Sequence, residues 1–310
     1  MNIVFMGTPE FAVPVLDVLS EMDVSIVAAY TKEDKPRGRG LRVVVSPVKK
    51  WAVDHGVMVL QPPSFRQPEA VRQLAALRPD VAVVAAYGRI LPREVLAIPP
   101  KGFVNIHPSM LPRYRGPSPV VTALLDGVKS TGVSLMLLDE GMDTGPILAQ
   151  REEPVLPNDT AESLTARLFQ RGAELLRETL PAWLRGEISP VPQDGSKATV
   201  TRMVQREDGE ADWGLPAVEL ERRVRAYTPW PGLYTRWKGK QVRIVEATVM
   251  AGDDEPGVVV ALDDRETPCG VATGRGVLGI KRLLLEGGRP MQAAEFVQGY
   301  RDFVGSRLPS

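Results

Sequence analysis

The stretch NIVFMGTPEFAVPVLDVLSEMDVSIVAAY, residues 2–30, decides the fold. It opens with NIVFM, a short apolar run that is typical of a buried strand. We expect a helix over residues 8–22, with Thr8 as its N-cap and Pro14 in its first turn. A second apolar run at 24–30 predicts another strand. A strand, a helix and a strand in this order are typical of a parallel sheet covered by helices.

The same alternation continues for more than half of the chain. Asp159 and Glu162 are expected to form a capping box that starts a long helix ending near Gly186. The other expected strands cover residues 57–61, 81–87, 103–107, 133–138 and 147–155. The other expected helices cover residues 46–56, 68–77 and 118–127. The pattern predicts an α/β fold whose parallel sheet is covered on both faces.

The hydrophobic pattern of the sequence changes after Gly186. Residues 187–203 have no hydrophobic period and are typical of a linker. A short helix at 217–227 is followed by strand-like runs at close spacing, which predict a small antiparallel barrel. We therefore expect three parts, which cover residues 1–189, 190–206 and 207–310.

Composition narrows the classes of function. Lys and Arg together number 38, as do Asp and Glu, so the whole-protein basic field of a dedicated nucleic-acid binder is absent. The single cysteine, Cys269, cannot form an internal disulfide and is expected to be a buried, inert thiol. With only two histidines besides, a transition-metal site is not expected. No apolar run approaches membrane-spanning length, so we expect a cytoplasmic protein.

The run FVNIHP, residues 103–108, carries the first candidate site. Alternate side chains of a strand point to opposite faces, so Asn105 and His107 should lie on one face at the end of the strand. Open α/β sheets bind ligands at such ends. An imidazole can exchange a proton near neutral pH, and a carboxamide can donate a hydrogen bond to an oxyanion, which suits acyl-type transfer. The alternative is that His107 only satisfies a loop carbonyl.

A cluster of acidic residues follows the strand at 133–138. Asp139, Glu140 and Asp143 lie in its end loop, and we expect this strand to neighbour 103–107, so that a carboxylate could orient His107. Alternatively, all three are solvated loop residues. Asp143-Thr144-Gly145 matches the aspartic-protease triplet, but that chemistry needs a second such triplet, and the chain has none.

Two segments could contact nucleic acid. The loop 31–42 is rich in cations and glycine and could bind a phosphate backbone, or it could be a solvated surface loop. Glu33 and Asp34 dilute its positive charge. The segment 221–243 interleaves cations with four aromatic residues, which could stack on bases or belong to the core.

Several motifs in one order carry a family resemblance: MGTPEFAVPVL, DKPRGRG leading into SPVK, AAYGRILP, NIHPSMLPRYRG, GMDTG and DW…AYTPWPG. Together they resemble the formyltransferases that use 10-formyltetrahydrofolate, and among these the members that act on methionyl-tRNA. The resemblance covers the whole chain. It implies a Rossmann-like formyltransferase domain and an OB-like barrel. It also implies formyl transfer from this cosubstrate to initiator methionyl-tRNA, by a protein we expect to be a monomer without a metal.

The resemblance also implies roles for individual residues. The catalytic trio would be Asn105, His107 and Asp143. The folate-binding segment would be the turn Ser109, Met110, Leu111 and Pro112. The tRNA-binding residues would lie in the basic loop: Arg39 above all, with Arg37, Arg42 and Lys35. Arg113 and Arg115 could face tRNA or solvent.

Other hypotheses about the function remain open. A formyltransferase acting on a sugar nucleotide or a purine precursor would share the catalytic residues, and so would a formylfolate hydrolase. The basic loop and the barrel favour a large polyanionic acceptor instead. An RNA-binding module without catalysis would have no need for a histidine, an amide and a carboxylate at strand ends.

Overall fold

The computed structural model describes residues 1–37 and 42–310, which form two compact units. Unit 1 comprises residues 1–119, 130–154 and 165–201, and unit 2 comprises 120–129, 155–164 and 202–310. The segment expected to be a linker therefore belongs to unit 1 as far as Thr201.

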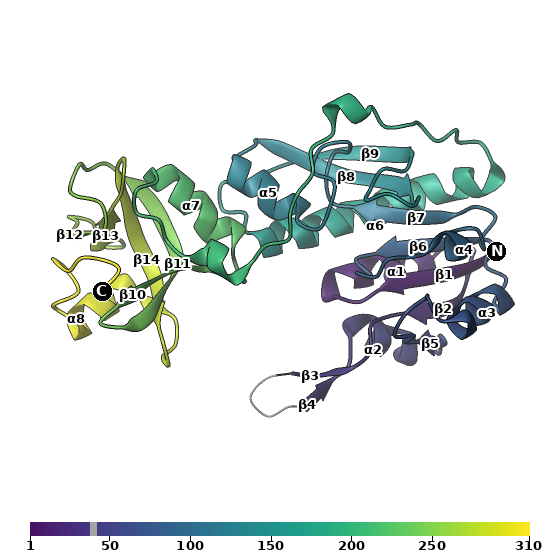
Figure 1. Cartoon of the computed structure of the whole chain (residues 1–310), viewed down its shortest axis with the longest axis horizontal. Helices are drawn as coiled ribbons and strands as arrows, with labels where there is room; N and C mark the ends of the chain where they lie inside the picture. The colour runs from purple at the N-terminus through teal and green to yellow at the C-terminus, as the bar shows by residue number, and fades with distance from the viewer. Residues whose placement is uncertain (38–41) are drawn as a thin grey trace. The chain divides into compact units, whose positions relative to one another are not determined.

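A seven-stranded sheet forms the centre of unit 1 (Figure 1). Its strand order is β5-β2-β1-β6-β7-β8-β9. The strands are β1 (Asn2–Gly7), β2 (Ser25–Tyr30), β5 (Val59–Leu60), β6 (Val81–Ala85), β7 (Phe103–His107), β8 (Ser130–Leu137) and β9 (Ile147–Pro154). The first five strands of that order pair in parallel, as predicted. The prediction of a parallel sheet was wrong for β8 and β9, which are antiparallel to their neighbours.

Helices cover both faces of this sheet, because its central strands are apolar on both sides. One apolar cluster joins β1, β6 and β7 to α1, α2 and α6, and the other joins the opposite strand faces to α3 and α4. These helices are α1 (Val13–Ser20), α2 (Pro47–Asp54), α3 (Pro68–Ala76), α4 (Arg93–Leu96) and α6 (Ala161–Arg185). All but the first residue of α5 (Pro119–Asp126) belongs to unit 2.

Two helix starts differ from the sequence prediction. Thr8 is not an N-cap: a 3₁₀ turn at Glu10–Ala12 precedes α1, because Pro14 lacks an N–H and belongs in the helix's first turn. The capping box of α6 lies one residue later than expected. Thr160 Oγ accepts from the Ser163 N–H at 3.2 Å, and Ser163 Oγ accepts from the Thr160 N–H at 3.0 Å. By contrast, Ser46 caps α2 as the sequence indicates.

Unit 2 contains an antiparallel sheet with the order β10-β11-β14-β13-β12 and β15 beside β14. This curled sheet fits the expected OB-like domain. Its strands are β10 (Leu233–Trp237), β11 (Lys240–Met250), β12 (Val259–Ala261), β13 (Cys269–Ala272), β14 (Val277–Leu285) and β15 (Met291–Gln292). The helices α7 (Ala217–Ala226) and α8 (Ala293–Gly299) pack on its core. Cys269 is buried there as expected, and desolvation raises the pKa of its thiol to about 12.

Candidate active site

His107 lies at the C-terminal end of β7 with only 4% of its surface exposed. Its Nε2 is 2.9 Å from the carbonyl oxygen of Tyr114. A carbonyl oxygen only accepts hydrogen bonds, so Nε2 must carry a proton. Nε2 therefore binds a loop carbonyl, as the alternative to a catalytic role had it. The other ring nitrogen, Nδ1, faces Asp143, with 3.6 Å between Nδ1 and Oδ2.

Asp143 reaches His107 by a route that differs from the expected one. Because β8 is antiparallel to β7, its last residue, Leu137, pairs with Val104 at the far end of β7 from His107. The loop from β8 to β9 must therefore fold back to bring Asp143 to the imidazole. There, Asp143 Oδ2 also accepts a 2.7 Å hydrogen bond from the Gly116 N–H.

Asn105 shares the face of His107, as the alternation predicts. Its neighbours Val104 and Ile106 point into the other face's core, with α6. Asn105 is half-buried, and its carboxamide makes no hydrogen bond to any residue within 1–37 and 42–310. The amide is therefore available to a ligand, beside an imidazole that has a carboxylate next to its second nitrogen.

The turn Ser109–Pro112, which is expected to bind folate, is held in place by the buried hydroxyl of Ser134. Ser134 Oγ, on β8, donates to the Ser109 carbonyl at 2.7 Å and accepts from the Leu111 N–H at 3.1 Å. It also accepts from Gln150 Nε2, which donates to the Leu111 carbonyl as well. Ser109 itself is fully buried, and its hydroxyl donates to the Arg113 carbonyl. Ser134 was not among the residues predicted for the site, although a serine inside the apolar run VSLMLL was a usable signal.

We expect Ser134→Ala to lower the free energy of unfolding by about 2–4 kcal/mol, because several buried polar groups then lose their partner. Urea unfolding measures this change. Ser130→Ala is the matched control, since Ser130 begins the same strand but is exposed, and we expect it to change stability by less than about 0.5 kcal/mol. Equal effects of the two substitutions would contradict this role of Ser134.

The basic segment forms a hairpin of β3 (Lys35–Arg37) and β4 (Arg42–Val44), so three of the four predicted tRNA-binding residues, Lys35, Arg37 and Arg42, lie on it. Arg39 lies outside the described residues. The two acids of this segment form ion pairs with cations outside it, Glu33 with Arg89 and Asp34 with Lys49.

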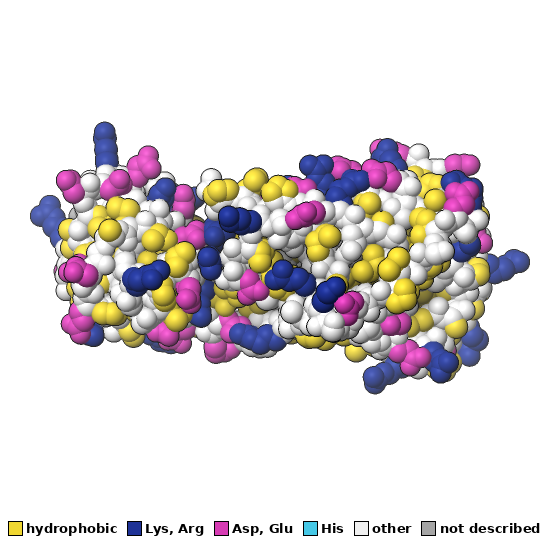
Figure 2. Space-filling view, turned by 90° about the horizontal axis from the view of Figure 1, so that it is seen from above, with side chains coloured by type: hydrophobic (Ala, Val, Ile, Leu, Met, Phe, Trp, Pro, Cys, Tyr) yellow, Lys and Arg dark blue, Asp and Glu magenta, His cyan; other side chains and the backbone are white. Residues whose placement is uncertain are grey.

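Asp34 lies just before β3. Hydrogen bonds from Lys49 and Gln61 hold the pKa of Asp34 below its usual value. On the face drawn in Figure 2, basic and acidic side chains are interspersed, in keeping with the balanced composition.

The aromatic residues of segment 221–243 divide between core and surface. Tyr227 and Trp237 are each 4% exposed and belong to the interior of unit 2. Trp230 is 56% exposed, and Tyr234 is half-buried. Only the exposed part of this set could stack on bases.

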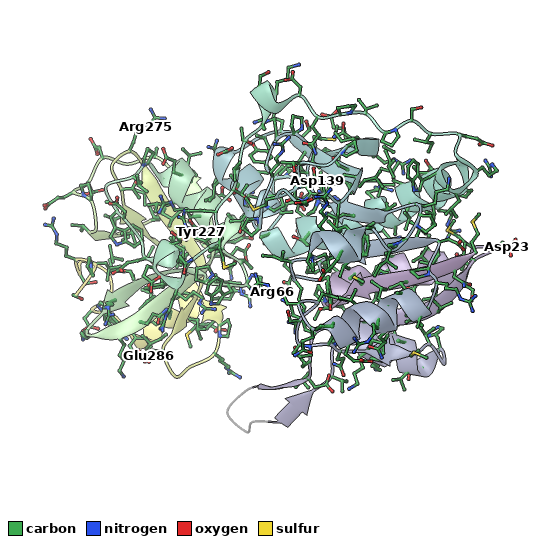
Figure 3. All side chains as sticks on the ribbon, turned by 45° about the vertical axis from the view of Figure 1, so that its right-hand side comes forward. Asp23, Arg66, Asp139, Tyr227, Arg275 and Glu286 are labelled. Atoms are coloured by element: carbon green, nitrogen blue, oxygen red, sulfur yellow. The ribbon has the colours of Figure 1, made fainter. Side chains whose placement is uncertain are left out.

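A cavity of about 410 Å³ lies beside the loop that carries Asp143. It is lined by Arg93 and Leu96 of α4, by Ala97 just after this helix and by residues 138–141, among them Asp139, which Figure 3 labels. Its lining is mixed, because Leu96, Ala97 and Leu138 are apolar whereas Arg93, Asp139 and Glu140 are charged. Within the described residues, no cluster of three or more His, Cys, Asp or Glu could hold a metal ion, and no helix is long and apolar enough to cross a membrane.

Arg113 and Arg115, which the sequence left open, both make contacts within unit 1. The Arg113 guanidinium donates to the Tyr114 hydroxyl at 3.0 Å and lies over its ring. The Arg115 guanidinium donates to the carboxamide oxygen of Gln193.

Comparison with known proteins matches both parts of the chain. A model of the formyl transferase family covers residues 1–180, and one of the formyl transferase C-terminal domain covers 203–301. Methionyl-tRNA formyltransferase from Roseiflexus sp. (strain RS-1) is 50% identical, over 99% of this chain and 95% of its own length.

Two solved structures share the fold. HypX from Aquifex aeolicus in complex with tetrahydrofolic acid has a TM-score of 0.64 at 19% identity, over 98% of this chain and 48% of that one. The N-formyltransferase from Helicobacter canadensis in complex with folinic acid and dTDP-3-aminofucose has a TM-score of 0.64 at 17% identity, over 90% and 98% of the two chains. With identity of about one half to a relative matched almost end to end, the chain belongs to the methionyl-tRNA formyltransferase family of formyl transferases.

Proposed function

We propose that this protein transfers the formyl group of 10-formyltetrahydrofolate to the α-amino group of initiator methionyl-tRNA. The observation that carries the chemistry is the uncommitted Asn105 amide beside His107, whose Nδ1 lies 3.6 Å from Asp143 Oδ2. The acceptor is supported by the full-length relatives, which bear the name methionyl-tRNA formyltransferase. A tetrahydrofolate cosubstrate is supported by the family and by the folate-bound neighbour of the same fold.

The proposed reaction begins when the amine attacks the formyl carbon, so that a C–N bond forms and the carbonyl oxygen becomes an oxyanion. The Asn105 amide donates a hydrogen bond to this oxygen. The amine gives up one proton, which His107 receives at Nδ1, because Nε2 is committed to the Tyr114 carbonyl. The imidazolium is stabilised by Asp143 and can donate to the oxyanion as well. The proton then passes to N10 of the folate as its bond to the formyl carbon breaks.

The cosubstrate has two candidate contacts on this chain. The cavity between α4 and residues 138–141 has the volume of a small-ligand site, and we propose that the ring system of the folate binds there. The turn Ser109–Pro112 would form a wall near the reacting group. Because Ser109 and Leu111 are buried, we expect this turn to act through its backbone and through Met110 rather than through the serine hydroxyl.

For the acceptor, we propose that the basic segment 31–42 contacts phosphates through Lys35, Arg37, Arg39 and Arg42. The proposal includes a catalytic part, 1–189, and a tRNA-binding OB-like part, 207–310. The linker proposed between them, 190–206, packs within unit 1 as far as Thr201. It also includes a monomeric state and a cytoplasmic location, where aminoacylated tRNA is used.

The test is formyl transfer from 10-formyltetrahydrofolate to charged initiator and elongator methionine tRNAs, with an amino-sugar nucleotide as a third acceptor. We expect product with the initiator tRNA at a rate at least about tenfold above the elongator, a difference of about 1.4 kcal/mol. Equal rates on both tRNAs would contradict the choice of acceptor. Transfer to the sugar nucleotide alone, or formate release without any acceptor, would replace the proposal by one of the rival activities.

A further inference from the structure

We propose that Gln193 is a positioning residue that aims the carboxylate of Asp143 at His107. Its carboxamide holds the Asp143 loop through the main chain and is itself held by Arg115. The part of this inference that concerns turnover rests on the proposed function; the part that concerns the geometry of Asp143 and His107 does not.

The Gln193 carboxamide donates hydrogen bonds to the Asp143 loop through its nitrogen and accepts hydrogen bonds from Arg115 through its oxygen. Its Nε2 donates to the carbonyl of Asp143 at 2.9 Å and to the carbonyl of Gly145 at 2.7 Å. Its Oε1 accepts from Arg115 Nε at 3.0 Å and from Nη2 at 2.8 Å. Because a guanidinium only donates and a carbonyl only accepts, this orientation of the amide is the one that satisfies all four contacts.

Arg115 is fixed through its backbone as well, by the segment that follows Gln193. Its N–H donates to the Thr199 carbonyl at 2.9 Å, and its carbonyl accepts from the Thr201 N–H at 2.7 Å. The next residue, Gly116, provides the N–H that binds Asp143 Oδ2. The segment 193–201 therefore holds both the loop that carries Asp143 and the backbone group that orients its carboxylate.

This support is needed because Asp143 has an unfavourable backbone conformation. Its φ is +53°, a left-handed value that side chains other than glycine adopt at a cost. Such conformations persist only when the surroundings enforce them, and here Gln193 binds the carbonyl of Asp143 and the carbonyl two residues later. Within residues 191–200, Gln193 is the polar residue that is partly buried, and the hydroxyl of the more exposed Thr199 accepts a hydrogen bond from the Tyr114 N–H.

Two substitutions separate the contacts of Gln193. Gln193→Met keeps the length of the side chain but removes every hydrogen bond. Gln193→Glu keeps an acceptor for Arg115 but loses both N–H donors to the loop. We expect kcat for formyl transfer to fall about tenfold or more in both, with little change in the KM for the folate, because a misplacement of about 1 Å can cost up to about a hundredfold. Val200→Thr is the matched control, since its exposed side chain lies in the same segment, and it should retain wild-type kcat.

A double-mutant cycle with Asp143→Asn distinguishes positioning from a general structural role. If Gln193 acts through Asp143, the double variant loses no more activity than Asp143→Asn alone. Losses that multiply, or wild-type kcat in both Gln193 variants, would overturn the proposal.

A second readout does not depend on turnover. The chain has two histidines, so the ¹⁵N ring signals of His107 can be followed beside those of His55. Gln193→Met and Gln193→Glu should shift the His107 signals and leave those of His55 in place, and Val200→Thr should shift neither. Unchanged His107 signals in both Gln193 variants would contradict the proposal even if the protein proved to use another acceptor.

Discussion

Replacing His107 with alanine is expected to lower kcat for formyl transfer about a thousandfold, because the amine then has no positioned base to receive its proton. The imidazole is fixed for this task by two neighbours, the Tyr114 carbonyl at Nε2 and Asp143 beside Nδ1. Single-turnover transfer from 10-formyltetrahydrofolate to charged initiator tRNA measures the effect directly. The KM for the folate should change little, since the ring is proposed to act on the proton and not on cosubstrate binding.

His55 provides the matched control. Its Nδ1 contacts the Trp51 carbonyl at 2.8 Å, and its ring stacks on Trp51, so its contacts are those of a structural residue at the end of α2. His55→Asn should retain wild-type transfer. His107→Gln complements the alanine variant, because its longer side chain can place an amide N–H at the position of Nε2, facing the Tyr114 carbonyl, while it removes the basic ring nitrogen. If both His107 variants retained more than about a tenth of the wild-type kcat, His107 would not be the general base, because loss of such a base usually costs about a hundredfold or more.

Several features of the fold and of the candidate site could be predicted from the sequence, because they depend on local periodicity. A strand's side chains alternate, so FVNIH was enough to put Asn105 and His107 on one face. The parallel part of the sheet followed from apolar strands separated by helices. The direction of β8 could not be predicted in this way, because a buried apolar run has the same pattern in either direction. The pairing register reveals it, with Leu137 opposite Val104 and Ser134 opposite His107.

The supports of the site were missed because their partners are distant in the chain. Gln193 lies 50 residues from Asp143 and 78 from Arg115, in a segment without hydrophobic period. Ser134 lies 25 residues from Ser109. Polar residues of this kind are ordinary members of a linker or a strand until the fold brings their partners together. The sequence alone could therefore propose the reacting groups but not what holds them.

Asn105 offers the second large expected effect. Asn105→Ala should lower kcat about a hundredfold to a thousandfold, the usual loss when one donor to an oxyanion is removed. The amide makes no hydrogen bond within the described parts of the chain, 1–37 and 42–310, so its removal leaves no protein partner unsatisfied there. The melting temperature should therefore change little. Asn158→Ala, at an exposed position, is the control for loss of an asparagine and should retain wild-type activity.

Asn105→Asp then tests whether this donor acts on developing negative charge. Aspartate has nearly the same shape as asparagine but offers no N–H when ionised, and its charge opposes an oxyanion at the same position. If Asn105 stabilises the oxyanion, the aspartate variant should be less active than the alanine variant, although it changes the shape of the site less. If Asn105 only fills space or supports the strand, the order reverses, and aspartate is the milder substitution. The rank of the two variants, measured in the same single-turnover assay, therefore decides between electrostatic and structural roles.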